Sequence, residues 1–304
     1  MEENLTIKKS NIDAAVTAHE HEILEQQTPT TYEYVLDLFE KDNDSFIEFE
    51  GFEKFSSTIR LKKHDHLTLA GETGGGKSAL ALNWVNSLSK KYPIIYFNLE
   101  MDELTVYKRL IAINEGIEIQ TLDNFKKDSK IKNIVSNGLK EITSRKPIFV
   151  FNTTYNISQM HQLIEKHSKE EHTIVFIDHT LLMDSSNGSK GYEKFTDIAK
   201  DLRKISRNEN ITLIVLTQMN RESKKTCYKP SVSALKESGE FESSSSHVAF
   251  IYQRYDKDGK MIDGSDELLV RKNRNGANGL DIPLSYDRST QKIQESTNNI
   301  KEYY

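Results

Sequence analysis

Short apolar segments alternate with helical patterns through the middle of the chain. The apolar segments are rich in Ile, Val and Phe and lie at residues 66–70, 94–98, 147–151, 173–177 and 211–216. Patterns with helical periodicity lie between them, at residues 79–90, 102–114, 131–144, 157–169 and 192–208. Strands that are separated by helices pair in parallel and are buried on both faces. The pattern therefore predicts an α/β fold with a mostly parallel, twisted sheet and helices on both of its faces.

The pattern changes after residue 247. Three segments, 247–255, 267–272 and 279–286, have strand composition and are joined by turns that contain Gly and Asp. Such turns are typical of antiparallel hairpins, which we expect at the edge of the sheet. Residues 288–304 are polar and are predicted to form a flexible tail. The serine run at 243–246 is predicted to be a flexible loop.

The first 45 residues are polar and lack strand signals, apart from a weak helical pattern at 12–27 and a sharper one that follows it. Tyr32, Val35, Leu36 and Phe39 fall at i, i+3, i+4 and i+7, so one face of this second helix is apolar. Thr30 or Thr31 is placed to cap its start. The apolar face packs either on its own domain or on a neighbouring subunit, and the periodicity leaves both open. We divide the chain into a linker with a docking helix (1–45), a larger α/β domain (46–287) and a flexible tail (288–304).

Composition places the chain among ordinary proteins of aqueous compartments. Hydrophobic residues make up 36% and charged residues 29%, and no run of 18 apolar residues is present that would predict a membrane span. The start of the chain lacks the apolar stretch of a signal peptide, and the single cysteine, Cys227, has no internal partner for a disulfide. We expect a cytoplasmic protein. The net charge of −5 argues against a protein that coats duplex DNA, although it permits a local basic loop.

The strongest chemical signal is a phosphate-binding loop between a predicted strand and a predicted helix. It matches the pattern G-x-x-x-x-G-K-S/T and consists of Gly71, Glu72, Thr73, Gly74, Gly75, Gly76, Lys77 and Ser78. Glycines allow the backbone N–H groups to surround phosphates, and the helix N-terminus adds partial positive charge. Lys77 is expected to reach the β- and γ-phosphates of ATP, and Ser78 to hold Mg²⁺.

Three polar residues follow apolar segments and are candidates for the chemistry. Asp178 comes at the end of an apolar strand, where an acid in this fold class helps to hold Mg²⁺. Glu100 ends another predicted strand and is a candidate base for the attacking water, or alternatively a helix-capping acid. Gln218 follows a third strand, where its amide either senses the γ-phosphate or begins a polar loop.

Two basic segments follow. Residues 220–236 contain five cations, Arg221, Lys224, Lys225, Lys229 and Lys236, against one acid, Glu222. This segment either binds the phosphates of a nucleic acid strand or is a solvated charge run. Lys272 and Arg274 enter a turn rich in Asn and Gly. There an arginine either acts in trans on a neighbour's γ-phosphate or belongs to an exposed hairpin.

In this order, the segments resemble the C-terminal, RecA-like ATPase domain of replicative DnaB-type hexameric helicases, from about residue 46 to 287. The most specific segments are Phe97-Asn98-Leu99-Glu100-Met101, Thr217-Gln218-Met219-Asn220-Arg221, Leu235-Lys236-Glu237-Ser238-Gly239 and Lys272-Asn273-Arg274-Asn275-Gly276.

The resemblance implies a motor that hydrolyses ATP with Mg²⁺ and moves on single-stranded DNA during DNA replication. It implies Glu100 as the catalytic base and Gln218 as the link between the γ-phosphate and the DNA loop. Lys272 and Arg274 would reach the neighbouring subunit's nucleotide, with Arg274 as the finger. The channel segment would include Lys236, Glu237 and Gly239 and touch the DNA backbone. Residues 183–192 would form the other channel loop, and the helix at 32–39 loosely matches the linker helix. The implied partners are other copies of the chain in a ring, expected to be a hexamer, and a helicase loader or primase.

The chain also departs from the family pattern. It has no room for the usual N-terminal collar domain before residue 46, so we expect a shortened version of phage or mobile-element type, without primase contact in the family's manner. Gly74 and Gly75 replace residues that are commonly less flexible, and the serine run at 243–246 replaces a more acidic stretch.

Two rival functions remain open. A recombination ATPase similar to RecA or RadA fits the phosphate loop, Asp178 and Gln218 nearly as well. Lys272, Arg274 and the segment 236–239 favour the helicase. An ATP-switched loader or regulator of a helicase would use the helix at 32–39 for docking and hydrolyse slowly. Glu100 argues against this switch, because a pure switch needs no base.

Overall fold

The computed structural model describes residues 31–41, 46–219, 229–235, 239–256 and 261–296. The chain divides into two units, residues 1–45 and 46–304, and each is described by itself. The predicted helix at 12–27 lies outside the described residues. Among the helices of the described ranges, none has the length and apolar character needed to cross a bilayer.

The larger unit is built on a nine-stranded sheet with the order β3-β2-β4-β5-β1-β6-β7-β8-β9. Its first six strands in this order are parallel, which confirms the predicted α/β class. These strands are β1 (His66–Gly71), β2 (Ile94–Asn98), β3 (Ile148–Phe151), β4 (Thr173–Asp178), β5 (Ile211–Gln218) and β6 (His247–Tyr252). Because β6 pairs in parallel with β1 and antiparallel with β7, it joins the parallel core to the antiparallel edge.

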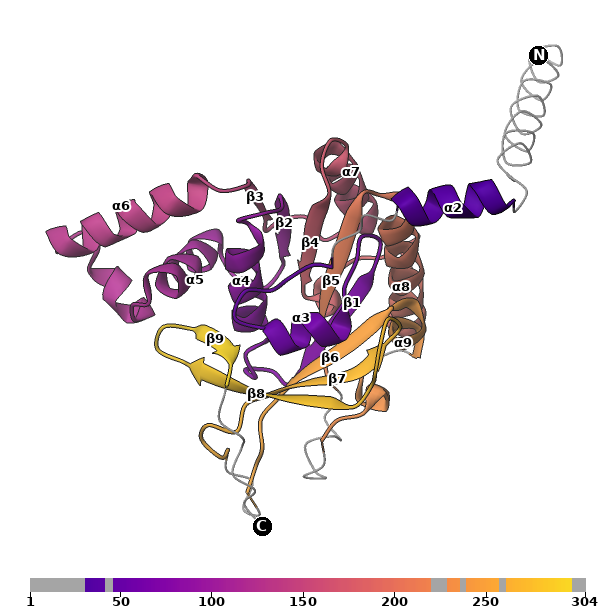
Figure 1. Cartoon of the computed structure of the whole chain (residues 1–304). Coiled ribbons are helices and arrows are strands. Elements are labelled where there is room, and N and C mark those ends of the chain that lie inside the picture. The colour runs from indigo at the N-terminus through magenta and orange to yellow at the C-terminus, as the bar shows by residue number, and fades with distance from the viewer. Residues whose placement is uncertain (1–30, 42–45, 220–228, 236–238, 257–260, 297–304) are drawn as a thin grey trace. The chain divides into compact units, whose positions relative to one another are not determined.

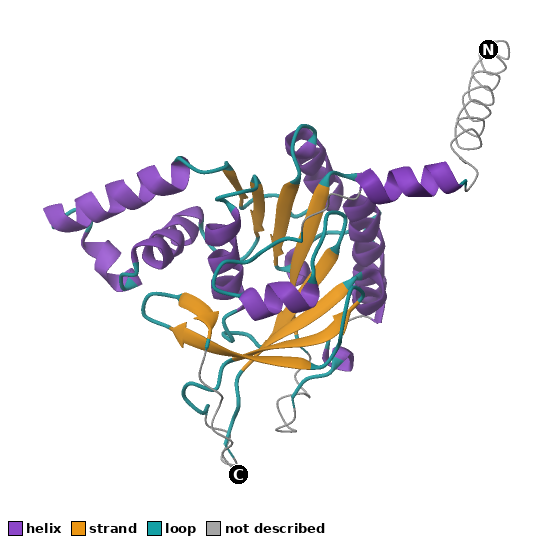
Figure 2. Cartoon of the chain, viewed as in Figure 1, coloured by secondary structure: helices purple, strands orange, loops and turns teal. Residues whose placement is uncertain are grey.

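Helices cover both faces of this sheet, as Figures 1 and 2 show. Side chains alternate along β2: Ile94 and Tyr96 belong to one hydrophobic cluster, while Ile95 and Phe97 belong to another. The first cluster includes buried residues of α4 (Lys77–Leu88), α5 (Glu103–Glu115) and α6 (Ser129–Thr143), and the second those of α7 (Ile157–Ser168) and α8 (Gly191–Asn208). Short 3-10 turns lie at Ile119–Asn124 (η1), Thr180–Leu182 (η2) and Val232–Ala234 (η4).

The antiparallel edge consists of β7 (Glu267–Asn273), β8 (Leu280–Asp287) and β9 (Lys292–Glu295). Strand β9 corrects the prediction of a flexible tail from residue 288. Ile293 is only 2% exposed. The Glu295 carboxylate accepts backbone N–H bonds from Lys54 (2.9 Å) and Phe55 (2.6 Å) at the start of α3 (Glu53–Ile59). An acid at this position satisfies free N–H groups of the helix and thereby fixes the end of the sheet.

The serine run is also ordered, contrary to the prediction of a flexible loop. It includes the end of α9 (Gly239–Ser244) and directly precedes β6, and Ser244, Ser245 and Ser246 are buried. The hydroxyl of Ser245 lies 2.6 Å from that of Thr68, and the Ser246 hydroxyl accepts the N–H of His66 at 2.9 Å. These hydroxyls pair inside the protein and so tie α9 to β1.

The smaller unit contains helix α2 (Tyr32–Lys41) within its described part. Thr31 caps the start of this helix, because its hydroxyl accepts the N–H of Tyr34 (3.1 Å) and its carbonyl that of Val35 (3.0 Å). Tyr32 and Phe39, on the predicted apolar face, are each 76% exposed.

Candidate nucleotide-binding site

The phosphate loop connects the end of β1 to the start of α4, as the motif requires. Gly74 and Gly76 have φ angles of +75° and +94°, which favour glycine. A Cβ atom on Gly76 would lie 2.9 Å from Cε1 of Tyr286 and 3.2 Å from Cδ1 of Ile251. The turn is closed by the N–H of Gly75, which donates to the Glu72 carbonyl at 3.0 Å. Both the backbone and its neighbours therefore require glycine at position 76.

Lys77 is buried at the base of this loop, only 7% exposed. Its ammonium donates to the carbonyls of Gly71 (3.1 Å) and Glu72 (2.8 Å). Burial lowers the pKa of Lys77, although nearby Asp178 and other acids act in the opposite direction. The side chain thus provides a partly desolvated donor at the place where the loop would hold phosphate.

A cavity of about 380 Å³ opens beside the loop. Its lining includes Thr73, Lys77 and Ser78 from the motif, together with Glu100 and Gln218 from two other strand ends. The structure therefore brings the proposed base and the proposed sensor to the phosphate loop. This follows from the parallel sheet, since strands β1, β2 and β5 all end at the same edge.

Asp178 is the last residue of β4 and is completely buried. The hydroxyl of Tyr96 donates to its Oδ2 at 2.7 Å. Burial raises the pKa of Asp178, and hydrogen bonds from Ser78 and Tyr96 offset part of this effect. Within the described ranges, its other oxygen, Oδ1, is buried and has no hydrogen-bond partner.

These atoms fit a Mg²⁺ ion that arrives with a nucleotide. Mg²⁺ prefers oxygen ligands and takes few of them from protein when phosphates and water supply the others. The Ser78 hydroxyl and the Asp178 carboxylate are such oxygens. The described residues include no cluster of three or more His, Cys, Asp or Glu side chains that would hold a metal by itself.

Glu100 lies two residues beyond the end of β2 and does not end the strand as the sequence predicts. Its side chain is half-exposed. Asp102, rather than Glu100, caps helix α5, because its carboxylate accepts the N–H of Thr105 at 2.9 Å. The alternative of a capping role for Glu100 is therefore wrong.

His179, which the sequence did not indicate, lies between Glu100, which follows β2, and Gln218, which ends β5. Its Nε2 atom lies 3.5 Å from Oε2 of Glu100 and 3.4 Å from Nε2 of Gln218. The ring is 5% exposed. Its position directly after Asp178 is the only signal in the sequence, and the sequence does not reveal which strand ends it faces.

Four further residues line the cavity that the sequence did not indicate: Arg109, Tyr286, Arg288 and Gln291. The Arg288 guanidinium carbon lies 4.4 Å from the centroid of the Tyr286 ring, and the Tyr286 hydroxyl donates to Gln291 at 3.3 Å. An aromatic face beside a guanidinium suits the stacking of a nucleotide base. Because β8 is far from the phosphate loop in sequence, only the folded sheet reveals this neighbourhood.

Lys272 and Arg274 lie toward the other end of the sheet. Lys272 pairs with Val248 near the start of β6, whereas Gly71 of the phosphate loop pairs with Ile251 near its end. The backbone of Arg274 bonds to the carbonyl of Ser246, which is roughly 16 Å along the strand direction from the level of Gly71. Arg274 is exposed, and the Lys272 ammonium bonds to the Glu242 carbonyl. The structure does not bring this pair to the phosphate loop of the same chain.

Most of the predicted DNA contacts, namely Arg221, Lys224, Lys225, Lys236 and Glu237, lie outside the described residues. Gly239 begins helix α9. Two residues at its borders are described: Met219, which directly precedes it, and Leu235 form an antiparallel bridge, and the N–H of Met219 donates to the Gly71 carbonyl at 3.2 Å. The residue before the segment therefore lies next to the phosphate loop, and Leu235 pairs with that residue.

Lys229 does not fit the interpretation of residues 220–236 as a loop whose cations are all available to bind DNA phosphates. It forms ion pairs with Glu267 (2.7 Å) and Asp281 (2.6 Å).

In the other predicted channel loop, residues 183–192, the hydroxyls of Ser186 and Ser189 donate hydrogen bonds to the carboxylates of Asp201 and Asp197 in α8.

Comparison with known proteins gives a consistent result. A family model described as the DnaB-like helicase C terminal domain matches residues 49–295. A probable replicative DNA helicase of Trieres chinensis is 32% identical over 254 residues, which cover 78% of this chain and 54% of the relative. A solved structure of an ATPase domain has a TM-score of 0.76 at 21% identity, over 88% of this chain and 99% of that one. A solved DnaB-like replicative helicase, reported with its interactions with primase, has a TM-score of 0.75 at 20% identity, over 94% of this chain and 76% of that one. The chain spans about half the length of the curated relatives it matches.

Proposed function

Because this chain belongs to the DnaB-like helicase C-terminal domain family, we propose that it is the motor of a replicative DNA helicase, which hydrolyses ATP to move along single-stranded DNA. The observation that carries the proposal is the cavity at the end of the parallel strands. Its lining combines the phosphate loop with Glu100 and Gln218, and the basic segment begins one residue beyond Met219, which bonds to Gly71. The site of ATP hydrolysis and the segment that binds single-stranded DNA would thus lie at the same edge of the sheet.

The positions of the side chains support the roles that we propose for them in ATP hydrolysis. Lys77 would bind the β- and γ-phosphates, and Ser78 and Asp178 would hold Mg²⁺. The bound Mg²⁺ would neutralise charge on the phosphates. Glu100, which is half-exposed at the cavity, accepts a proton from the attacking water. His179 keeps the Glu100 carboxylate and the Gln218 amide in register.

Gln218 transmits the state of the γ-phosphate to the DNA segment, because it ends β5 immediately before Met219. Loss of the phosphate removes a partner of its amide, and the backbone of residues 218–219 then shifts relative to Gly71. The DNA contacts of Arg221, Lys224, Lys225, Lys236, Glu237 and Gly239 are mainly to phosphates, so we expect little sequence preference.

The active form is a homo-oligomeric ring, which we propose to be a hexamer. Arg274 is exposed and remote from its own phosphate loop, which supports a role on the nucleotide of the next subunit. The exposed apolar face of α2, with Tyr32 and Phe39, supports docking on another subunit. A helicase loader or a primase is the further partner that we expect.

The family match does not favour either rival. A recombination ATPase would pair strands without unwinding, and an ATP-switched loader would hydrolyse slowly. Relatives that match include proteins of Mycoplasma pneumoniae and Helicobacter pylori that are named replicative DNA helicases.

The decisive experiment measures ATP hydrolysis with and without single-stranded DNA, together with unwinding of a forked duplex. We expect DNA-stimulated hydrolysis with unwinding, and neither activity in Lys77→Ala. Stimulated hydrolysis with annealing and no unwinding would support the recombination ATPase. Negligible hydrolysis in both conditions would support the switch. Native mass spectrometry with ATP and DNA tests the ring, and monomers alone would contradict it.

A further inference from the structure

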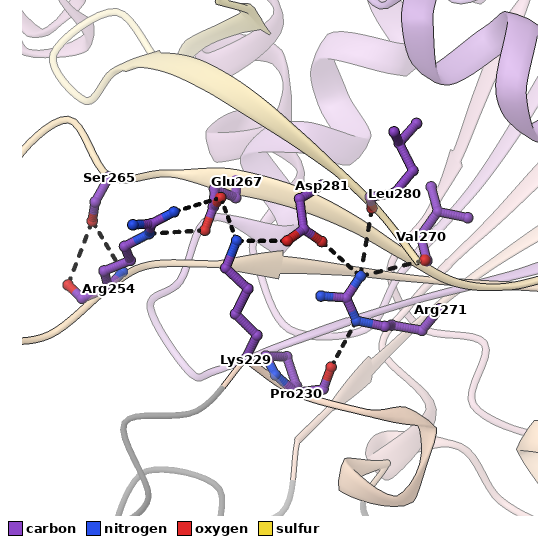
Figure 3. Close-up of polar contacts among 9 residues, drawn as sticks. All are labelled: Lys229, Pro230, Arg254, Ser265, Glu267, Val270, Arg271, Leu280 and Asp281. Atoms are coloured by element: carbon purple, nitrogen blue, oxygen red, sulfur yellow. Dashed lines mark hydrogen bonds and ion pairs between the residues drawn. The ribbon is translucent and has the colours of Figure 1, made fainter. Parts of the chain in front are cut away.

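Five charged side chains form a continuous ladder beside strands β7 and β8 (Figure 3). In order of contact, they are Arg254, Glu267, Lys229, Asp281 and Arg271. Glu267 receives Arg254 at 3.1 Å and Lys229 at 2.7 Å. Asp281 receives Lys229 at 2.6 Å and Arg271 at 2.7 Å. Lys229 is the middle member and contacts both carboxylates.

The sheet register explains why these groups meet. Glu267 and Arg271 are four residues apart on β7, so their side chains lie on one face of the sheet. Asp281 on β8 pairs with Leu269, midway between them. Leu269 itself is buried in the cluster that contains Met219, which precedes the basic segment, and Leu235, which lies within it. The charged ladder therefore lies beside the hydrophobic cluster in which these two residues pack.

The charges strongly restrain the position of Lys229. Glu267 is 2% exposed, and a buried carboxylate is costly unless cations pair with it. Burial acts to raise the pKa of Asp281, but hydrogen bonds from Lys229 and Arg271 outweigh it and lower the pKa. The lowered pKa keeps the Asp281 carboxylate ionised at neutral pH, and the ion pairs of Asp281 and Glu267 hold the Lys229 ammonium between them. A lysine held in this way is not a free cation for a DNA phosphate.

The ladder also reaches three other parts of the proposed motor. Arg271 donates from Nε to the carbonyl of Pro230 at 2.9 Å, which fixes the backbone of the basic segment at this residue. Arg271 directly precedes Lys272. At the other end, Arg254 precedes Tyr255, whose hydroxyl donates to Glu72 of the phosphate loop at 3.0 Å.

We propose that Glu267 and Asp281 are positioning residues that anchor the basic segment at Lys229 and Pro230, and thereby couple DNA contact to the nucleotide site. The coupling rests on the proposed function, whereas the anchoring does not. In this arrangement Lys229 is an anchor point, while the cations between residues 220 and 228 remain for DNA.

The test uses the full chain with the variants Asp281→Asn and Lys229→Met, the conservative variant Lys229→Arg, and the control Lys146→Met. Lys146 pairs with Glu171 at 2.6 Å on the surface, so its loss removes a similar ion pair elsewhere. ATP hydrolysis is measured without DNA and with saturating oligothymidylate. We expect the DNA-stimulated rate of Asp281→Asn and Lys229→Met to fall about two- to thirtyfold, the range for residues that couple two sites. Lys229→Arg and Lys146→Met should keep the wild-type stimulation.

The salt dependence of oligothymidylate binding separates an anchor from a DNA contact. Removal of one phosphate contact lowers the slope of log K against log salt concentration by about 0.7 for a single strand. We expect Lys229→Met to keep the wild-type slope. A smaller slope, with wild-type stimulation at saturating oligothymidylate, would assign Lys229 to the DNA and overturn the proposal, as would wild-type behaviour of both Asp281→Asn and Lys229→Met.

Limited trypsin digestion tests the anchoring without reference to DNA. Loss of the anchor should make the sites after Arg221, Lys224 and Lys225 easier to cleave, so we expect trypsin to cut Asp281→Asn about twofold or more faster than wild type. Unchanged cleavage would overturn the anchor. If wild-type protein shows no response to DNA, the proposed function fails, while the digestion still decides whether the anchor exists. Should Asp281→Asn fail to fold, Lys229→Met gives the same comparison.

Discussion

The imidazole of His179 lies 3.5 Å from the Glu100 carboxylate, and its same nitrogen is 3.4 Å from the amide of Gln218. One nearly buried ring therefore touches both the proposed base and the proposed sensor. The three residues end or follow three strands, β2, β4 and β5, which the parallel sheet places side by side. A change at His179 should accordingly disturb both functions.

Replacement of His179 by alanine should lower the turnover of ATP about tenfold or more, because a misplaced catalytic group loses the alignment that it needs. The KM for ATP should change little, since Lys77 and Ser78 still bind the phosphates. Steady-state hydrolysis with and without DNA checks this prediction. Loss of the response to DNA in addition to turnover would indicate that Gln218 is also released. A variant with wild-type kcat under both conditions would contradict a positioning role for His179.

The glycines of the phosphate loop allow a matched comparison. Gly74→Ala places a side chain where no atom lies within 4 Å, so it suffers only the strain of positive φ, about 1–2 kcal/mol. Gly76→Ala has the same kind of strain and also meets Tyr286 at 2.9 Å. We expect the second variant to be the less stable and to bind ATP more weakly, because the Tyr286 ring must move.

Urea unfolding followed by the fluorescence of Trp84 measures both stabilities, since this residue is the single tryptophan and is fully buried. Titration with a fluorescent ATP analogue measures binding. Equal decreases in the free energy of unfolding and in ATP affinity in the two alanine variants would show that the contact with Tyr286 has no effect.

Local patterns in the sequence were sufficient for the parallel core. The apolar segments that became β2 and β4 are long enough to stand out, and the phosphate loop is a contiguous motif between a strand and a helix. In contrast, β9 has only four residues and α3 only seven, too few for a clear periodicity. Both depend on a contact between distant parts of the chain, the bonds from Lys54 and Phe55 to Glu295.

Composition was misleading where polar groups are paired inside the protein. Serine is common in loops, yet Ser245 and Ser246 are buried because Thr68 and His66 supply partners from β1. Likewise, Lys229 appeared to be one of several similar cations, although two carboxylates from β7 and β8 hold it. His179 and Tyr286 were missed because their neighbours at the site come from other strands. These relationships arise from the register of the sheet, which a single sequence does not reveal.

Arg274 provides a test of action between subunits. Arg274→Ala should lower ATP turnover on the order of 10³-fold while leaving ATP binding largely intact, because a trans-acting arginine stabilises the transition state. Arg207→Ala, an exposed arginine at the end of α8, is the control and should have normal turnover. Mixed rings provide a second measurement. Rings assembled from a mixture of Arg274→Ala subunits and Lys77→Ala subunits should regain part of the activity, since some interfaces then contain both an intact Lys77 and an intact Arg274. Normal turnover of Arg274→Ala would exclude the trans finger.

The buried histidine of β1 predicts how stability depends on pH. Burial, together with the nearby His247 and Lys272, lowers the pKa of His66 from 6.5 to about 3. Between these two values the unfolded chain binds a proton that the folded protein excludes, so the contribution of His66 to stability falls as pH decreases from 6.5 toward 3. His66 alone changes the free energy of unfolding by at most about 1.4 kcal/mol per pH unit.

The substitution His66→Gln should make the protein relatively more stable as the pH is lowered, because glutamine carries no proton to exclude. Urea unfolding of wild type and His66→Gln at pH 7, 6 and 5, followed by Trp84 fluorescence, gives the difference in the free energy of unfolding at each pH. We expect glutamine to be destabilising or neutral at pH 7, where it loses the packing of the ring, and this difference to shift in its favour by roughly 1–2 kcal/mol at pH 5. His247 lies nearby, and burial lowers its pKa as well, so the double variant with His247→Gln should show a still flatter dependence on pH. A difference between wild type and His66→Gln that stays constant from pH 7 to 5 would mean that the folded protein accommodates the protonated ring, contrary to its burial in β1.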